Sequence, residues 1–308
     1  MLGPALLKAS RSPRLRRVVS STRPTRRVVD RFVAGERLGD ALRTVRDLTA
    51  HGIDVTLDHL GEDIASAADA RASRDAYLRA LDTLAPLNLA RRVEVSIKLS
   101  AFGQALPGGH ELALANVEPV AAAAADHGTT ITLDMEDSST VDSTLAIVAD
   151  LRGRFPGTGA VLQSYLHRTP QDAVALAAAG SRVRLVKGAY RESAAVAWQS
   201  KADVDRAYGQ CLEILFRGDG YPMVGSHDPR MIERAQQLAE QVGRAPDTYE
   251  FQMLYGIRTT EQQRLVSDGF QVRAYVPYGA DWYGYFMRRL AERPANTLFF
   301  LRALASRG

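Results

Sequence analysis

The stretch Val93-Glu-Val-Ser-Ile-Lys98 alternates apolar and polar side chains along its whole length. Alternation with a period of two is typical of a β-strand whose two faces meet different surroundings. Further short segments rich in β-branched residues recur along the chain, and each is followed by a longer helical pattern. The eight predicted strands are Ile53–Leu57, Val93–Lys98, Thr130–Asp134, Ala160–Tyr165, Arg182–Lys187, Tyr221–Gly225, Tyr249–Gln252 and Gln271–Val276.

Helical segments separate these strands, which favours parallel pairing through right-handed crossovers. Eight such units close a TIM-type (β/α)8 barrel, and 308 residues accommodate it as a single domain. We expect 1–50 to form a basic arm and helices capping the barrel, and 51–308 the barrel and a final helix. The predicted helices are Gly39–Ala50, Ser73–Leu84, Leu112–Asp126, Val141–Leu151, Pro170–Ala179, Val204–Leu215, Pro229–Gln241, Thr260–Ser267 and Asp281–Arg293.

The strands alternate so that one parity is apolar and is expected to pack outward against the helices. The other parity is unusually polar, whereas barrel interiors are ordinarily filled with Val, Ile and Leu. Because buried charges are costly unless paired, we expect a deep salt-bridge network among Glu94, Glu250, Arg182 and Arg273. Polar residues at the C-terminal strand ends are candidate site residues, because barrel enzymes carry their sites there; they are Lys98, Asp134, Gln163, Arg184 and His227.

Two lysines stand at predicted strand ends. Lys98 shares the inward parity with Asp134, and the residues alone leave three roles open: a carboxylate clamp, a Schiff-base nucleophile, or a partner of Asp134. The segment from Arg184 to Tyr190 places Arg184 and Lys187 beside a glycine turn. Exposed backbone N–H groups next to two cations suit a phosphate or an electron-poor ring.

Ser226-His227-Asp228-Pro229 closes the sixth strand and opens a helix, with proline at its first position. The segment suits a phosphate site at a helix N-terminus or a metal-ligand histidine; alternatively, Asp228 caps the helix and His227 packs. A metal hydrolase would draw on His59, Asp134, Glu136 and His227. No His-x-His or similar ligand spacing occurs, so no metal is expected.

The predicted final helix places four functional side chains on one face. Tyr285, Arg288, Arg289 and Glu292 stand at positions i, i+3, i+4 and i+7. A solvent-exposed, ion-paired face is the plain alternative. The helix follows the eighth strand, however, and so should lie near the barrel mouth, where two guanidinium groups present donors matched to a carboxylate.

Composition and charge bound the class of protein. One cysteine, Cys211, excludes an internal disulfide and indicates an intracellular chain, although a secreted protein without disulfides remains open. The first 29 residues carry no acidic side chain, which leaves open a solvated tail, an organelle-targeting segment or an arm attracted to anionic lipid or nucleic acid. We rank the solvated tail first, a membrane-surface role second and nucleic acid last. No basic stripe with interleaved aromatics follows, so no nucleic-acid partner is expected. The basic residues of this arm are Lys8, Arg11, Arg14, Arg16, Arg17, Arg23, Arg26 and Arg27.

Motifs in order along the chain resemble the proline dehydrogenase family. They include Val-Ser-Ile-Lys98-Leu-Ser, Leu-Asp134-Met-Glu-Asp, Gln163-Ser-Tyr, Arg184-Leu-Val-Lys-Gly-Ala-Tyr, Phe-Gln-Met-Leu254-Tyr-Gly, Tyr275-Val-Pro-Tyr-Gly and the final helix through Glu292. The resemblance implies an FAD-bearing barrel that oxidises L-proline to Δ1-pyrroline-5-carboxylate and passes electrons to a membrane quinone. It also implies a cytoplasmic enzyme, with peripheral association at the inner face of the membrane open to it. The chain is too short for an added aldehyde dehydrogenase domain, so the single-activity form is expected.

The resemblance also implies a role for each matched residue. Lys98, Arg288 and Arg289 would bind the proline carboxylate, and Leu254, Tyr275 and Tyr285 would enclose the ring. Arg184 would lie near flavin N5, and Asp134 would be a catalytic carboxylate. The flavin would contact Met135, Gln163, Val186, Lys187, Gly188, Ala189, Ser226 and His227, with Glu292 pairing in the arginine cluster.

Two other functions compete with this one. A Schiff-base aldolase would use Lys98 or Lys187 and would be colourless. A non-catalytic binder or membrane-surface adaptor using the basic arm would lack both flavin and turnover.

Overall fold

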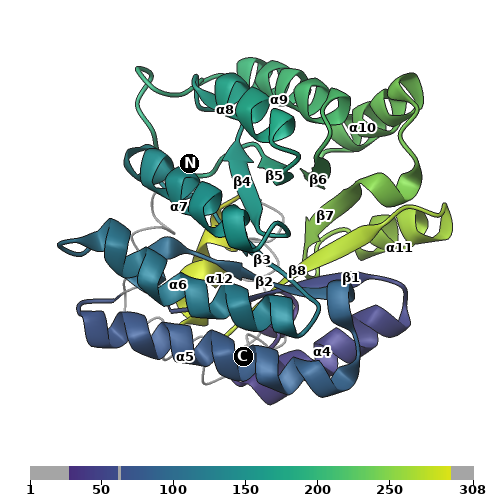
Figure 1. Cartoon of the computed structure of the whole chain (residues 1–308). Coiled ribbons are helices and arrows are strands. Elements are labelled where there is room, and N and C mark those ends of the chain that lie inside the picture. Colours follow the sequence, from purple (N-terminus) through teal and green to yellow (C-terminus); the bar gives the residue numbers. More distant parts are fainter. Residues whose placement is uncertain (1–27, 62–63, 293–308) are drawn as a thin grey trace, which may run out of the picture.

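Eight parallel strands close into a barrel at the centre of the protein (Figure 1). A computed structural model describes residues 28–61 and 64–292. Each strand pairs with the next along the chain, and β8 pairs with β1, which confirms the predicted TIM-type architecture. The strands are β1 (Asp54–His59), β2 (Val93–Ile97), β3 (Ile131–Leu133), β4 (Gly159–Gln163), β5 (Arg182–Val186), β6 (Tyr221–Gly225), β7 (Glu250–Leu254) and β8 (Val272–Tyr278).

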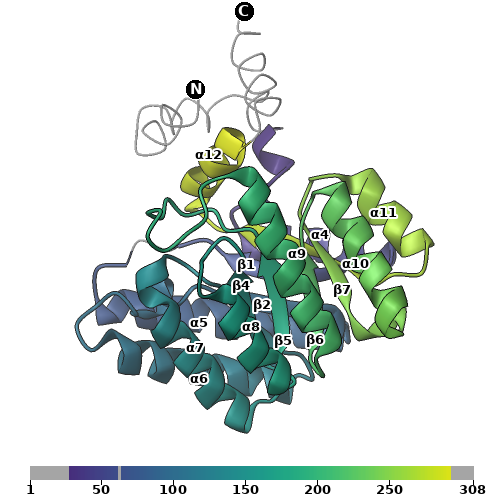
Figure 2. The ribbon, with the colours of Figure 1, turned by 90° about the horizontal axis from the view of Figure 1, so that it is seen from above.

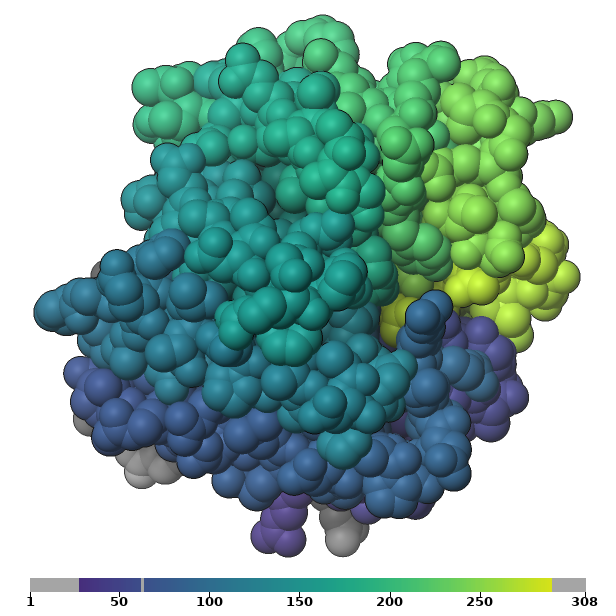
Figure 3. Space-filling model, viewed as in Figure 1, coloured from purple at the N-terminus to yellow at the C-terminus, as the bar shows by residue number. Residues whose placement is uncertain are grey.

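Helices form a ring around the strands (Figure 1), and the space-filling view in the same orientation shows their side chains packed closely around the barrel (Figure 3). Within the described ranges, no helix is long and apolar enough to cross a membrane. Those that follow β1 to β7 are α5 (Ala67–Leu84), α6 (Gly109–Asp126), α7 (Val141–Arg154), α8 (Thr169–Ala178), α9 (Lys201–Arg217), α10 (Pro229–Val242) and α11 (Thr259–Ser267). Short 3-10 turns are η1 (Ala85–Leu87), η2 (Ala90–Arg92), η3 (Leu99–Phe102), η4 (Ser138–Thr140) and η5 (Pro246–Thr248).

Two helices depart from a plain ring. α4 (Leu38–Ala50) buries Ala41 and Val45 in the core around the barrel and packs on the sides of β1 and β8, rather than over an end as expected. α12 (Trp282–Glu292) follows β8 but lies beyond one end of the barrel (Figure 2). The place beside β8 and β1 is therefore filled from the N-terminal side of the chain, which leaves α12 available to cover the mouth.

The apolar parity of the strands forms the layer between barrel and helices, as predicted. Val55, Val95, Leu133 and Leu185 are all 1% exposed or less and belong to one core cluster with the ring helices. Removing such side chains from water is the main favourable term in folding. Strand bounds differ from the predicted ones by up to two residues, most visibly in β8, which continues to Tyr278 because it pairs with β1 as far as His59.

The polar parity faces the lumen, and its centre is Glu94. This carboxylate is 1% exposed and accepts hydrogen bonds from Thr56 (2.8 Å) and Thr132 (3.2 Å). It also pairs with Arg182 at 2.9 Å and Arg184 at 3.4 Å. Three strands thus supply donors to a single buried anion on a fourth, which is the compensation that a buried charge requires.

A second buried pair lies beside it. Arg273 contacts Glu250 at 2.8 Å, lies 3.5 Å from Asp54, and donates to the backbone oxygen of Val55. The predicted network of Glu94, Glu250, Arg182 and Arg273 is therefore confirmed as two adjacent clusters in the barrel interior.

The pKa of Glu94 records this balance. Burial alone would raise it, but the guanidinium groups of Arg182, Arg273 and Arg184 outweigh burial and lower the pKa to about 2. The carboxylate therefore stays ionised in the folded protein. A depressed pKa stabilises the fold above the ordinary value of 4.5, and this stabilisation is lost as pH falls toward 2.

We predict that Glu94→Gln lowers the free energy of unfolding by about 3–5 kcal/mol, because it leaves buried guanidinium groups without their counter-ion. Urea unfolding of both proteins at pH 7 and at pH 3 measures this, and the difference between them should shrink at the lower pH. The control is Glu118→Gln, which removes an exposed partner of Arg154 and should leave the transition unchanged. Equal stability of Glu94→Gln and wild type at pH 7 would contradict the prediction.

Candidate active site

Candidate residues from four strands meet at the C-terminal end of the barrel. Lys98 follows β2, and its Nζ lies 2.8 Å from Asp58 at the end of β1 and 3.8 Å from Asp134 after β3. Tyr275 of β8 joins the two sides, because its hydroxyl donates to Asp134 (2.7 Å) and accepts from Lys98 (3.4 Å). The inward parity of these residues was predicted, but the nearer carboxylate of Lys98 is Asp58 rather than Asp134.

Arg184 is held from several sides just below this group. Its guanidinium donates to Asp134 (2.8 Å), to the hydroxyl of Ser96 (2.9 Å) and to Gln252, and its centre lies 5.2 Å from the ring centroid of Tyr275. The residue is 4% exposed. A cation fixed by that many partners is preorganised, so it need not reorient to meet charge that develops on a ligand.

Tyr275 is the hydrogen-bond donor between these charges. Burial raises the pKa of its hydroxyl well above the ordinary value of 10, and the negative charges of Asp134 and Asp58 raise it further. The phenol therefore keeps its proton and donates a hydrogen bond to Asp134.

The candidate residues of β4 and the segment after β3 line the neighbouring part of the mouth. The side-chain amide of Gln163 is buried and donates to the backbone oxygen of Glu136. The Glu136 carboxylate in turn accepts from the backbone N–H (3.0 Å) and hydroxyl (2.7 Å) of Ser100. Met135 packs in a small apolar cluster with Tyr165. These contacts fix Gln163 at the end of β4, the strand that pairs with the strand of Arg184.

The exit of β5 is shaped by a glycine. Gly188 has a φ of +105°, and a Cβ at this position would lie 2.3 Å from the ring of Tyr165. The backbone oxygens of Val186 and Lys187 accept from the N–H groups of Ser164 (2.8 Å) and Tyr165 (3.0 Å). The strand therefore leaves the barrel along the edge of β4, and the following residue, Ala189, is exposed.

The Lys187 side chain enters an ion cluster between the starts of α9 and α10. It pairs with Asp205 and, at 2.9 Å, with Asp228, the carboxylates that also bind Lys201 and Arg230. Burial would raise the pKa of Asp228, but its hydrogen bonds with Arg230 and Lys187 lower it, so this carboxylate is ionised at neutral pH. Asp228 also accepts from the backbone N–H of Arg230, so it caps α10, one of the predicted alternatives.

His227 is fixed by the strand beside it. Its Nε2 accepts a hydrogen bond of 2.9 Å from the backbone N–H of Leu254, so the neutral ring carries its proton on Nδ1. Its backbone oxygen accepts from Arg258 at 3.2 Å. Ser226 is also part of this turn, and its hydroxyl accepts from the backbone N–H of Asp228. The hydrogen bond from Leu254 thus fixes the orientation of the imidazole ring.

α12 closes the mouth. Tyr285 belongs to an apolar cluster with Leu60 after β1, Ile257 after β7 and, at its border, Leu254. The Arg289 guanidinium lies 5.1 Å from the ring centroid of Tyr285. Arg288 and Arg289 are half-buried. The side chain of Glu292, the last residue of α12, lies outside the described residues.

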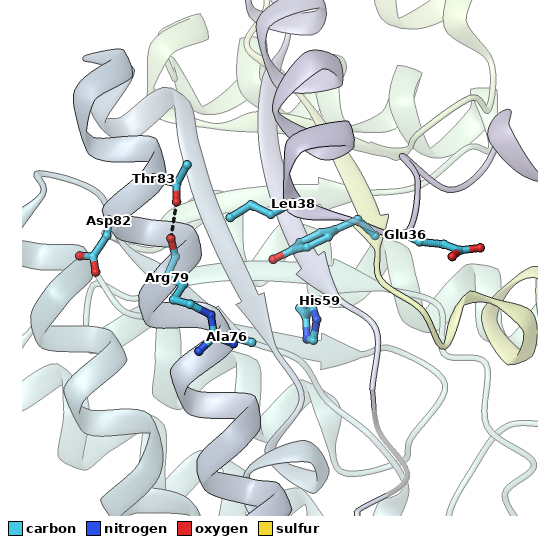
Figure 4. A pocket seen from close by; sticks show the side chains of 8 residues that line it. Glu36, Leu38, His59, Ala76, Arg79, Asp82 and Thr83 are labelled. Carbon is cyan, nitrogen blue, oxygen red and sulfur yellow. Dashed lines mark hydrogen bonds between the residues drawn. The ribbon is translucent and has the colours of Figure 1, made fainter.

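A surface pocket of about 350 Å³ lies close by but on the other side of β1 (Figure 4). Its lining includes His59 and Tyr278, which belong to the outward parity, so it is separate from the lumen of Asp58 and Lys98. Among the residues that the structure describes, no three His, Cys, Asp or Glu side chains are grouped to hold a metal ion. His59, Asp134, Glu136 and His227 are therefore not grouped as a set of metal ligands.

Asp58 is the site residue that sequence analysis did not select. It stands on the inward parity at the end of a strand, as Lys98 and Asp134 do, so the same rule could have found it. What the sequence could not supply is the distance of 2.8 Å that makes it the nearer partner of Lys98.

Comparison with known proteins identifies the family to which the whole barrel belongs. The sequence profile of the family described as proline dehydrogenase matches residues 41–302. The chain is 39% identical to proline dehydrogenase 2 of Bacillus subtilis and 40% identical to proline dehydrogenase of Deinococcus radiodurans, and covers 90% of both chains in each case. Its fold is similar to proline utilization A from Bdellovibrio bacteriovorus inactivated by N-propargylglycine (TM-score 0.79, 26% identity, 86% of this chain). The chain spans about a third, 32%, of that solved protein.

We predict that Gly188→Ala destabilises the protein more than Gly180→Ala does. Both glycines have positive φ, so both substitutions strain the backbone by about 1–3 kcal/mol. Only at residue 188 does the added Cβ also meet a neighbour, the Tyr165 ring, whereas nothing lies within 4 Å at residue 180. Thermal unfolding of the two variants measures the difference. Equal melting temperatures would show that the Tyr165 ring moves aside at no cost.

Proposed function

Because this chain belongs to the proline dehydrogenase family, we propose that it oxidises L-proline to Δ1-pyrroline-5-carboxylate, with FAD as hydride acceptor and a membrane quinone as the final electron acceptor. The observation that carries the proposal is the packing of α12 on Leu60, Leu254 and Ile257. It sets Tyr285 and the arginine pair at the barrel end that holds Lys98 and Arg184.

The substrate would be held by its carboxylate and its ring. Arg288, Arg289 and Lys98 supply the cations for the carboxylate. Tyr275, Tyr285 and Leu254 supply apolar surface for a ring of five atoms, since Leu254 is beside Tyr275 in the β7–β8 register and borders the cluster of Tyr285. Positioning is the main task of such a site, because removing a hydride from a ring carbon needs no protein nucleophile.

The donors present at the mouth fit a flavin. Arg184 and the amide of Gln163 come from adjacent strands, and the orientation of His227 is fixed by Leu254. The backbone from Val186 to Ala189 and the hydroxyl of Ser226 would hold the rest of FAD, with Met135 against the ring system. When bound, FAD supplies the hydride acceptor. Arg184, which Asp134 and Gln252 fix in place, would favour the negative charge that reduction brings.

The ion cluster of Lys187 suits the charge of the cofactor. Lys187, Lys201 and Arg230 face two carboxylates, Asp205 and Asp228, so this group of five side chains has one positive charge in excess. An excess cation beside the N-termini of α9 and α10 favours an anion such as a pyrophosphate. This supports the assignment of Lys187 to the cofactor site through its charge.

Two observations weigh against a Schiff-base aldolase. Lys98 is paired with Asp58, and Lys187 with Asp205 and Asp228. A Schiff-base lysine must present its amine to a carbonyl carbon, whereas both of these amines are held by carboxylates.

We predict that the purified protein binds FAD and shows the blue absorption of an oxidised flavin, which bleaches when L-proline is added without oxygen. Proline must lose its amine proton before hydride transfer, so the rate of bleaching should rise with pH. Stopped-flow absorbance measures this, and D-proline or glycine serves as control. A colourless protein that neither takes up FAD nor responds to proline would end the proposal.

We predict that Arg288→Met or Arg289→Met raises KM for proline steeply, because each removes a charged hydrogen-bond donor from the substrate carboxylate at a cost of ~3 kcal/mol. Steady-state kinetics with an artificial electron acceptor provides the measurement. Arg234→Met, an arginine on the outer ring helix α10, is the control and should keep the wild-type KM. Unchanged kinetics in both α12 variants would show that these arginines do not bind the substrate and serve only the packing and ion pairing of the helix.

A further inference from the structure

We propose that Asp58 is a positioning residue that holds the ammonium of Lys98 where it meets the substrate carboxylate. The inference rests on the proposed function and assigns a role to a residue outside the family motifs described above. Asp58 ends the lumen-facing series of β1 and is 1% exposed, and its Oδ2 lies 2.8 Å from Lys98 Nζ. The next carboxylate, that of Asp134, is 3.8 Å from the same nitrogen.

The contact decides where Lys98 can point. A lysine side chain has four rotatable bonds, and it loses much of its conformational freedom when its ammonium is held in one place. Lys98 stands just past the end of β2, and the β1–β2 register sets Asp58 beside Ser96, one position from the end of that strand. Asp58 on one side and the Tyr275 hydroxyl at 3.4 Å on the other orient the ammonium across the mouth.

Asp134 is engaged elsewhere. Its Oδ1 accepts from Arg184 (2.8 Å) and Ser96 (2.9 Å), and its Oδ2 accepts from Tyr275 (2.7 Å). If Asp58 lost its charge, Lys98 would be drawn toward Asp134, which would disturb both the ammonium and the group that holds Arg184. Asp58 therefore keeps two cations on two separate carboxylates.

Charge gives the proposal a distinctive sign. With Lys98 present, the negative charge of Asp58 is compensated by the lysine ammonium and does not repel the substrate carboxylate. With Lys98 removed, the same Asp58 becomes a buried anion beside an anionic ligand, and like charges in a low-dielectric site repel strongly. Neutralising Asp58 should thus weaken carboxylate binding in the wild type but strengthen it when Lys98 is absent.

The experiment is a double-mutant cycle on the flavin-loaded enzyme with Asp58→Asn, Lys98→Met and both together. KM for L-proline is measured, along with the Kd of cyclopentanecarboxylate, which has the carboxylate and ring but no amine, from the flavin spectrum. We expect Asp58→Asn to raise both by about tenfold, the loss of one charged hydrogen bond, and to change kcat by less than about threefold. In the Lys98→Met background the same substitution should lower both constants.

Asp54→Asn is the matched control. It makes the same change on the same strand, but Asp54 stands at the opposite end and pairs with Arg92 and Arg273. It should keep the wild-type KM. If Asp58→Asn fails to fold, judged by thermal unfolding, Asp58→Ser and Asp58→Glu test the same sign; Asp58→Glu keeps the charge and should recover most of the affinity.

Two results would overturn the proposal: unchanged binding in Asp58→Asn, or equal weakening with and without Lys98, which would mean that Asp58 acts on the fold alone. Failure of the proposed function is seen separately, because wild-type enzyme would then lack flavin or ignore proline before any variant is compared.

Discussion

The structure depends on the neutralisation of charges inside a closed barrel. Glu94 lies at the centre of the lumen with Arg182 and Arg184 around it, and Arg273 and Glu250 pair next to it. An apolar interior would need no such pairing, whereas a buried ion that loses its partner strongly destabilises the fold. The barrel therefore tolerates its polar lumen only because six of its strands (β1, β2, β3, β5, β7 and β8) contribute, within them or just past their ends, the charged side chains that pair there.

This deep layer supports the layer above it. Arg184 contacts Glu94 below and Asp134 above, and Asp134 in turn accepts from Tyr275, which contacts Lys98. Each side chain at the mouth is thus oriented by one that is buried beneath or beside it. Preorganised donors of this kind favour charge that develops during a reaction without the cost of reorientation. The proposed oxidation of proline requires the protein mainly to position substrate and cofactor, because it needs no protein nucleophile.

The chain order of the helices makes room for the substrate side. α4, which precedes the first strand, packs against β1 and β8, where a helix following β8 would complete the ring. α12 is thereby released to lie over the mouth, where Tyr285 packs with residues that follow β1 and β7. Because α4 takes the ring position that would otherwise belong to the helix after β8, α12 can cover the C-terminal end of the barrel.

The sequence by itself determined the barrel, its eight strands and the polar lumen, because a period of two fixes which side chains share a face. It also located Lys98, Asp134, Arg184 and the arginine pair of α12, since parity and strand ends depend only on chain position. It did not show that Asp58 is the nearer partner of Lys98, that Lys187 joins Asp205 and Asp228, or that α4 lies in the ring. Those facts depend on which strands and helices are neighbours and on distances of a few ångströms between residues far apart in the chain, which only the folded structure sets.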